Sequence, residues 1–227
     1  MASETSVPTH RRVRRGSAED HDQLRQQIVA AAFAIHEREG VSALSMRALA
    51  AEMGVSPMAL YRYYPSKADL LRAMWEVVLS DAQASVKAAV ATQKTARARL
   101  RASIESFLRY WESHPAHFRL VYMTPETMED RAQGAPLTGS EAYVSAVDLA
   151  GPLIDELVAE IGGRKDRALV ARDLRMSLMV GYLHARIVNT RYPWSDFDAL
   201  RACAVETIAA GVEACVARSP ARSAKRS

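Results

Sequence analysis

The sequence is poor in the residues that build sheets and disulfide frameworks. Of its 227 residues only two are cysteine, ten are glycine and nine are proline, and alternating runs of Val, Ile and Thr are scarce. Few strand formers and helix breakers, with abundant alanine and a 49% hydrophobic content, predict an all-α protein with a sizeable core. We expect no β-strand.

Long hydrophobic runs are also missing. The longest apolar run, residues 28–35, is too short to cross a bilayer, and the N-terminus lacks a signal-peptide pattern. We therefore expect a cytoplasmic protein with no membrane partner. Cys203 and Cys215 lie far apart on one predicted helix, so we do not expect a disulfide between them. Reduced packing residues are expected there, and a redox sensor is the alternative.

Motifs of catalysis are absent as well. The chain has no phosphate-binding glycine loop, dinucleotide fingerprint, nucleophile elbow or zinc-protease pair, so we predict neither an enzyme nor a cofactor. His114 and His117 form an H-x-x-H pair, but Pro115 stands between them and no further ligand completes a metal site. Ordinary helix-end histidines are the favoured interpretation, and no metal is expected.

The most informative pattern present lies in residues 45–71. Ala50 and Gly54 are four apart on one predicted helix, where small side chains allow a second helix to cross closely. Leu60 then supplies the apolar anchor of that second helix. Gly54 is expected to end the first helix in a left-handed conformation, with Val55 filling the corner. The spacing predicts a helix-turn-helix.

The second helix of this unit has a clear start. Ser56 is a favourable N-cap and Pro57 a favourable first residue, which predicts a helix from Pro57 to residue 64. Ser66 and Asp69 repeat the device at the next helix, and they place Lys67 beside an N-terminus whose free N–H groups suit a phosphate.

The run GVSPMALYRYYPSKADLL, residues 54–71, closely resembles the signature of tetracycline-repressor-like (TetR) transcription regulators. The match covers roughly the first third of the chain. It departs from the family at Tyr63 and Tyr64, where a His-Phe pair is more usual. The resemblance implies a homodimer that binds a palindromic double-stranded DNA operator and responds to a small-molecule effector, more often as a repressor than as an activator.

The resemblance also implies DNA contacts along this unit. The second helix would enter the major groove and present base-reading side chains, while flanking residues contact the backbone. Arg47 would reach a guanine or a phosphate, or else remain a surface charge. The expected DNA-binding residues are Ser45, Arg47, Ser56, Pro57, Met58, Ala59, Tyr61, Arg62, Tyr63 and Lys67.

The chain divides into four predicted parts. Residues 1–17 form a basic arm, either solvated or bound to DNA, and residues 18–83 form the helix-turn-helix domain, with a supporting helix over 18–39 and a connecting helix. Residues 84–217 form a ligand-binding and dimerisation domain, and residues 218–227 a basic disordered tail. Helices are expected at 96–113, 115–123, 141–161, 166–190 and 196–217, with 124–140 either a lid or disordered.

The helix at 166–190 is apolar or small on nearly every side, so it must be buried on more than one face. With the last helix it predicts a four-helix seam between two copies of the chain, and a monomer that buries both faces itself is the alternative. The expected interface residues are Leu174, Ser177, Leu178, Gly181, Tyr182, Ala185, Ala202, Val205, Ala209 and Val212.

Large and flexible side chains recur on the C-terminal helices, where they form either a solid core or an effector cavity. Because the family it resembles keeps an effector pocket in this domain, we expect the cavity, with His184 as its best polar residue. The expected pocket residues are Phe107, Tyr110, Trp111, Phe118, Tyr122, Met123, Tyr143, Met176, Met179, Leu183 and His184. The alternative function is a helical small-molecule carrier without sequence-specific DNA binding.

Overall fold

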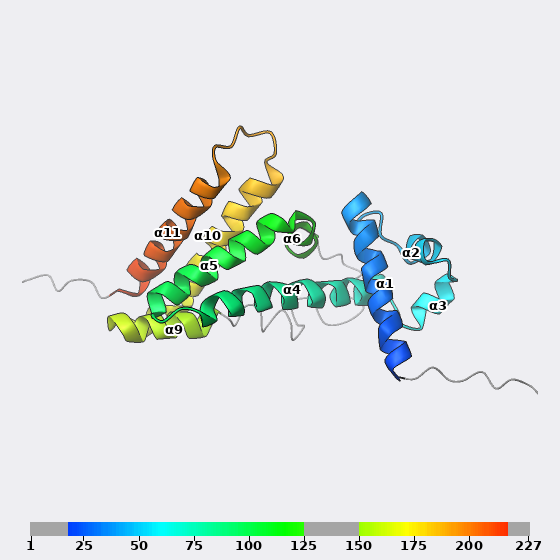
Figure 1. Ribbon diagram of the computed structural model, residues 1–227, viewed down its shortest axis with the longest axis horizontal. Coiled ribbons are helices and arrows are strands. Elements are labelled where there is room, and N and C mark those ends of the chain that lie inside the picture. The colour runs from blue at the N-terminus through cyan, green and yellow to red at the C-terminus, as the bar shows by residue number, and fades with distance from the viewer. Residues whose placement is uncertain (1–17, 125–149, 218–227) are drawn as a thin grey trace, which may run out of the picture. The chain divides into compact units, whose positions relative to one another are not determined.

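The computed structural model describes residues 18–124 and 150–217. Throughout these ranges the regular structure is helical and includes no strand. No described helix has both the length and the apolar content that a bilayer crossing requires. In chain order the helices are α1 (Ala18–Glu39), α2 (Met46–Met53), α3 (Pro57–Tyr61), α4 (Lys67–Ala91), α5 (Ala96–Ser113), α6 (Pro115–Tyr122), α9 (Ala150–Ile161), the 3-10 turn η2 (Lys165–Arg167), α10 (Ala168–Val188) and α11 (Phe197–Val216) (Figure 1).

The observed helices match most of the expected ranges to within two residues. The clearest difference is α3, which ends at Tyr61 and not at residue 64. The cause is local, because the Leu60 carbonyl accepts hydrogen bonds from the N–H groups of both Tyr63 and Tyr64. That doubly used carbonyl tightens the last turn and ends the helix. Of the helix expected at 141–161, only the part from Ala150 lies in the described residues.

The chain separates into two compact units, and the boundary in the sequence falls between Lys67 and Ala68. The first unit contains α1, α2 and α3, and α2 packs against both of the others. All of α4 after its first residue belongs to the second unit, whereas the sequence suggested a domain boundary after residue 83. The structural division therefore puts the connecting helix with the C-terminal domain.

The core of the second unit is built around α5. This helix packs against α6, α9, α10 and α11, and its fully buried side chains Leu100, Ile104, Leu108 and Trp111 follow one another at helical spacing (Figure 1). Burying each such side chain contributes about 1.5–3 kcal/mol. The same four residues form one stripe, so a single helix face organises the packing of the whole unit.

Polar bonds at one end of α5 hold the last two helices. Tyr182 on α10 donates a hydrogen bond to Glu112 Oε1 at 2.7 Å, and Arg201 on α11 donates to Glu112 Oε2 at 2.6 Å. Arg201 also pairs with Asp198 on its own helix. The Glu112 and Arg201 side chains are only 10% and 12% exposed, so this cluster fixes α10 and α11 against α5.

Candidate functional site

The helix-turn-helix is held by capping contacts that each span only a few residues. Ser45 precedes α2 with extended backbone angles, and its Oγ accepts a hydrogen bond from the Ala48 N–H at 3.1 Å. Ser56 does the same for α3, accepting from the Ala59 N–H at 3.3 Å. Pro57 follows as the first residue of α3. The second helix therefore begins where Ser56 and Pro57 predict, and the Ser45 cap of α2 is a further finding of the structure.

The turn between α2 and α3 depends on Gly54. Its φ of 66° lies in the left-handed region, where a side chain would be strained, and its N–H bonds back to α2 carbonyls. The expected role of Val55 is wrong. Its N–H does bond to Ala50, but its side chain is 41% exposed and does not fill the corner. The crossing is closed by the buried side chains of Leu49, Ala50 and Leu60.

The structure places nearly all of the expected DNA-binding residues on the surface of the first unit. Met58 is 73% exposed, an unusual position for a large apolar side chain without a binding partner. The exposed members of the set are Ser45, Arg47, Ser56, Pro57, Met58, Tyr61, Arg62 and Lys67, while Ala59 and Tyr63 are half-buried. An exposed α3 is the geometry required to enter a groove.

The segment that contains α3 carries positive charge only. Residues 54–68 include Arg62 and Lys67 but no aspartate or glutamate. No ion pair engages Arg47 or Arg62 within residues 18–124 and 150–217. Arg38 of the same unit, in contrast, pairs with Glu52. Unpaired arginines beside an acid-free helix attract phosphate and offer a bidentate fork to a guanine edge.

Sequence reasoning missed the residues of α1 that position the end of α3. Arg25 donates a hydrogen bond to the carbonyl oxygen of Tyr63 at 2.9 Å, and its guanidinium lies 4.6 Å from the centre of the buried Tyr64 ring. The His21 and Tyr63 rings lie 4.7 Å apart. Lys67 donates to the Val41 carbonyl at 3.4 Å. No short-range pattern in the sequence indicates these contacts.

Comparison with known proteins identifies the chain. The signature described as "Bacterial regulatory proteins, tetR family" matches residues 28–74, which include both helices of the motif. The chain is 28% identical over 185 residues to the HTH-type transcriptional activator FasR of Mycolicibacterium smegmatis, covering 82% of this chain and 78% of the relative. Residues 28–74 form a TetR-family DNA-binding domain. The chain is a DNA-binding transcription regulator and not an enzyme.

Two further comparisons extend this result. The HTH-type transcriptional repressor DrrR1 of Streptomyces coeruleorubidus is 48% identical over 52 residues, which span 23% of this regulator and 19% of the relative. The crystal structure of TetR-Q116A from Acinetobacter baumannii AYE in complex with minocycline has a TM-score of 0.60 and 22% identity, covering 85% of this chain and 98% of that one. This structural likeness shows the shared fold.

In the second unit of this regulator, the expected pocket residues on α5 and α6 form an aromatic cluster. The rings of Trp111 and Tyr122 lie 5.2 Å apart and those of Phe118 and Tyr122 lie 4.9 Å apart. Phe107 and Tyr110 contact the other edges of Trp111. Met179 and Leu183 are fully buried and Met176 is half-buried, so these residues face the interior as expected.

Two of the expected pocket residues are exposed. His184 is on the outer face of α10, because it lies one residue beyond the buried Leu183 and on the other side of the helix. Met123 follows the end of α6 and is also exposed. The prediction of His184 as a polar pocket residue is therefore wrong. Tyr143 lies outside the described residues, as do the basic arm, the C-terminal tail and nearly all of the 124–140 segment.

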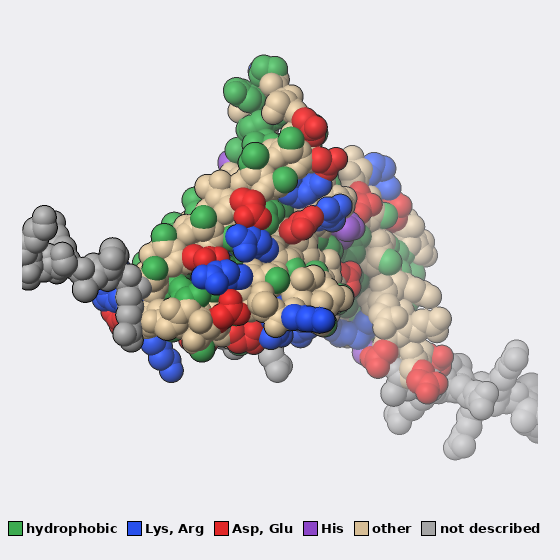
Figure 2. Space-filling model, turned by 60° about the vertical axis from the view of Figure 1, so that its left-hand side comes forward, with side chains coloured by type: hydrophobic (Ala, Val, Ile, Leu, Met, Phe, Trp, Pro, Cys, Tyr) green, Lys and Arg blue, Asp and Glu red, His purple; other side chains and the backbone are tan. Residues whose placement is uncertain are grey.

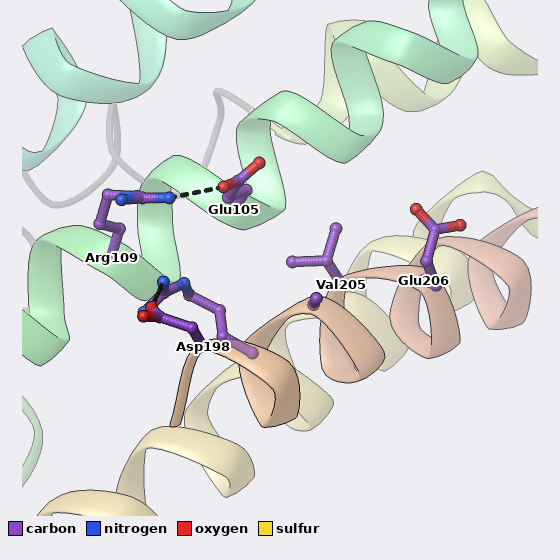
Figure 3. A pocket seen from close by; sticks show the side chains of 7 residues that line it. Glu105, Arg109, Asp198, Val205 and Glu206 are labelled. Atoms are coloured by element: carbon purple, nitrogen blue, oxygen red, sulfur yellow. Dashed lines mark hydrogen bonds and ion pairs between the residues drawn. The ribbon is translucent and has the colours of Figure 1, made fainter. Parts of the chain in front are cut away.

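A groove of about 470 Å³ opens between α5 and α11 (Figure 3). It is lined by Glu105, Arg109, Asp198, Arg201, Ala202, Val205 and Glu206. Its charges already pair with one another or with neighbours, since Arg109 bonds Glu105 on α5 and Arg101 bonds Glu206 across the helices. The charged side chains of the groove are therefore neutralised by ion pairs, and its lining includes none of the expected aromatic pocket residues.

On α10 the expected interface residues are exposed or half-buried, and their contact with a partner chain stays a prediction. There the exposed positions include Ser177, Leu178 and Gly181, with Leu174, Tyr182 and Ala185 half-buried. On α11, Ala202 is exposed, but Val205, Ala209 and Val212 are buried inside their own chain and cannot form a seam. The exposed positions of α11 are mostly small: Ala199, Ala202, Cys203, Thr207, Ala210 and Ala214.

The surface of the second unit offers both apolar and charged regions. Charged side chains alternate along the face over α5 and α11, where Arg97 pairs with Glu213 and Arg101 with Glu206 (Figure 2). Apolar side chains gather instead on α10 and the connection to α11. The exposed large ones there are Leu169, Val170, Leu178, Val188, Tyr192 and Phe197.

The histidine pair and the two cysteines show no sign of a metal site or a disulfide in the described residues. The His114 and His117 rings stack 5.1 Å apart, beside Tyr110, and the described residues hold no cluster of three or more metal-ligating side chains. Cys203 and Cys215 are both free thiols on α11.

Proposed function

We propose that α3 enters the major groove of a palindromic operator, with Met58, Ala59 and Arg62 at base edges. Ser56, Tyr61, Tyr63 and Lys67 then contact the phosphate backbone, and Ser45 and Arg47 approach it from the start of α2. The observation that supports this most strongly is the exposed, acid-free surface around α3, on which a 73% exposed methionine stands beside an unpaired arginine. Met58 supplies the apolar contact that thymine methyl groups favour.

The regulator acts as a homodimer joined through α10 and α11. Gly181 is exposed, and apart from its chain neighbours and the backbone of its own helix, no described atom lies within 4 Å of the position that a β-carbon would take there. A partner helix can therefore approach the backbone of α10 closely. The small exposed residues of α11 allow the same approach, and the exposed apolar residues of α10 supply the buried area of a two-fold seam.

A small amphipathic molecule bound in the second unit releases the DNA. The dimer has two conformers, and in one of them the two α3 helices are no longer spaced to enter successive major grooves. An effector favours that conformer to the extent that it binds it more tightly than the other. The solved TetR-Q116A chain with minocycline supports a ligand site on this fold. We propose that the regulator represses transcription, since a protein bound at the operator blocks transcription without any further contact. Its proposed location is the cytoplasm. FasR is an activator and DrrR1 a repressor, so the sign is tested directly.

The test is recovery of bound fragments from sheared genomic DNA at moderate salt, followed by sequencing. An enriched near-palindrome supports the proposal, and a reporter placed behind that site gives the sign of regulation. A small-molecule extract of cells, added to the purified complex, should release it. Weak binding that is alike at every site, from folded dimeric protein, would favour a helical small-molecule carrier over this proposal. The matched control is the double variant R62A/K67A, which should enrich nothing.

A further inference from the structure

The interior of the second unit contains a positive charge for which the described residues supply no counter-ion. Arg175 on α10 is 6% exposed. Its Nη2 donates a hydrogen bond to Ser103 Oγ at 3.2 Å, and that hydroxyl donates in turn to the Leu100 carbonyl at 2.7 Å. Arg175 Nε has no hydrogen-bond partner, and no described carboxylate forms an ion pair with this guanidinium. One neutral hydroxyl is thus its recorded partner.

This arrangement is unusual because buried charges in folded proteins are normally paired. Other arginines of the same unit show the ordinary pattern, since Arg201 pairs with Glu112 and Arg99 with Glu156. Burial lowers the pKa of Arg175 to about 10, which leaves it charged at neutral pH. Among the described residues this guanidinium is thus a buried cation without a paired carboxylate, which disfavours the unliganded fold.

A second unsatisfied donor lies in the same core. Trp111 is fully buried on α5, and its indole Nε1 has no acceptor. Tyr122 links the two sites, because its ring lies 5.2 Å from the Trp111 ring and its hydroxyl is close enough to act electrostatically on Arg175. Guanidinium and indole N–H groups only donate, so the missing group must be an acceptor.

The chemistry of these donors selects the ligand. The Nε–H and the second N–H of Nη2 form one edge of a planar fork, which matches the two oxygens of a carboxylate. In the same unit the rings of Trp111, Phe118 and Tyr122 pack against one another and offer apolar and aromatic contacts. We propose that the effector is a carboxylic acid with an apolar body, and that Arg175 binds its carboxylate inside the second unit. This inference rests on the proposed effector response.

The first test uses the full-length protein and two matched pairs of probes: 2-naphthoate with methyl 2-naphthoate, and decanoate with methyl decanoate. Calorimetry should show that at least one acid binds at least about ten-fold more tightly than its ester, because only the acid supplies the counter-ion. R175Q should abolish that preference and leave ester binding within about two-fold. R172Q is the control, since Arg172 lies on the same helix but already pairs with Asp173. It should change neither.

The second test needs no ligand. R175M should raise the melting temperature of the free protein, because it removes an unpaired buried charge while keeping the side-chain bulk. A residue with a merely structural role would give the opposite shift. The inference is overturned if neither acid binds more tightly than its ester, if R175Q leaves the preference intact, or if R175M melts lower. Release of operator by a cell extract, unaffected by R175Q, would overturn it while leaving the proposed function standing.

Discussion

The Arg25 guanidinium donates its Nη1 hydrogen bond to the carbonyl oxygen of Tyr63 across 2.9 Å, joining α1 to the end of α3. The same side chain lies over the Tyr64 ring, and the Tyr64 hydroxyl donates back to the Arg25 carbonyl at 3.4 Å. A five-residue helix cannot hold its own orientation. This reciprocal contact supplies the orientation, so Arg25 is a positioning residue for the DNA-reading helix.

Replacing Arg25 by methionine should therefore lower operator affinity although Arg25 is not itself expected to contact a base. Loss of a charge-assisted hydrogen bond and a cation–π contact should also reduce the free energy of unfolding by about 1–2 kcal/mol. Fluorescence anisotropy with operator DNA and chemical denaturation measure the two effects. Gln26→Met, at an exposed neighbouring position on α1, is the control and should leave both unchanged.

Arg62 and Lys67 should differ in the kind of DNA binding they support. R62A should cost about 1–3 kcal/mol of discrimination at one base pair of each half-site, as expected for a lost arginine–guanine fork. K67A should weaken binding to all sequences alike and lower the salt slope by about one unit. Titrations at several salt concentrations separate the two. Arg38→Ala is the control, because Arg38 is neutralised by Glu52. Unchanged affinity and salt slope in both variants would show that α3 docks differently.

Gly181→Leu should disrupt the dimer and leave the folded chain intact. The position is exposed, with open space around the missing side chain, so leucine fits the free subunit and improves helix propensity. Light scattering should show a shift toward monomer, whereas Ala159→Leu on the exposed face of α9 should not. A Gly181→Leu protein that remains dimeric would place the seam elsewhere.

Val212→Ala should show the reverse behaviour. The valine is fully buried in its own chain, so truncation leaves a cavity and lowers the free energy of unfolding by about 2 kcal/mol. The dimer dissociation constant should stay unchanged apart from the stability effect. If Val212→Ala dissociates the dimer without lowering the free energy of unfolding, Val212 belongs to the dimer interface after all.

Removing one partner of the Glu112–Arg201 pair should be strongly destabilising. Glu112→Ala leaves the nearly buried Arg201 guanidinium with only Asp198 as a partner, for an expected loss of about 3 kcal/mol. The double variant Glu112→Leu/Arg201→Met should recover most of that loss, because two apolar residues remove both charges together. Thermal denaturation of the single and double variants checks this, and a double variant no more stable than the single one would contradict it.

The stability of the second unit should fall at alkaline pH through Tyr110. Burial, with a smaller contribution from the Asp81 charge, raises the pKa of Tyr110 from 10.0 to about 12. The folded state therefore holds the proton more tightly than the unfolded state. That stabilisation is complete below pH 10 and is lost as the pH rises through about 12. Denaturation at about pH 9 and about pH 11 should show a smaller decline for Tyr110→Phe than for the exposed control Tyr192→Phe.

The helix-turn-helix could be predicted from sequence because its signals are local. Gly54 and Ser56 act on backbone groups within four residues, and the structure confirms both as caps. The Ser45 cap of α2 is equally local, but we did not predict it. Amphipathic spacing likewise gave the helices of the second unit to within two residues in the described ranges. The exposed positions of the predicted DNA contacts follow from the same local geometry, and their contacts with DNA remain a prediction.

For helices that are apolar on nearly every side, the sequence did not correctly predict which face packs inside the chain and which lies at the surface. On α11 the spacing of Val205, Ala209 and Val212 defines a stripe, but it does not show whether that stripe faces its own core or a partner. His184 was placed in a pocket for the same reason. Hydrophobic periodicity fixes which residues share a face and leaves open what covers that face.

The sequence by itself determined the helical class, the DNA-binding motif and the ends of most helices, because capping, turns and periodicity depend on near neighbours. Only the tertiary structure decided where Arg25 and Arg175 act. The first contacts a residue 38 positions away and the second a residue 72 positions away. An arginine on a helix is ordinarily solvated, so no local pattern shows that Arg175 is held in the core with no ion pair to the described carboxylates. Contacts made across such distances exist only once the chain has packed.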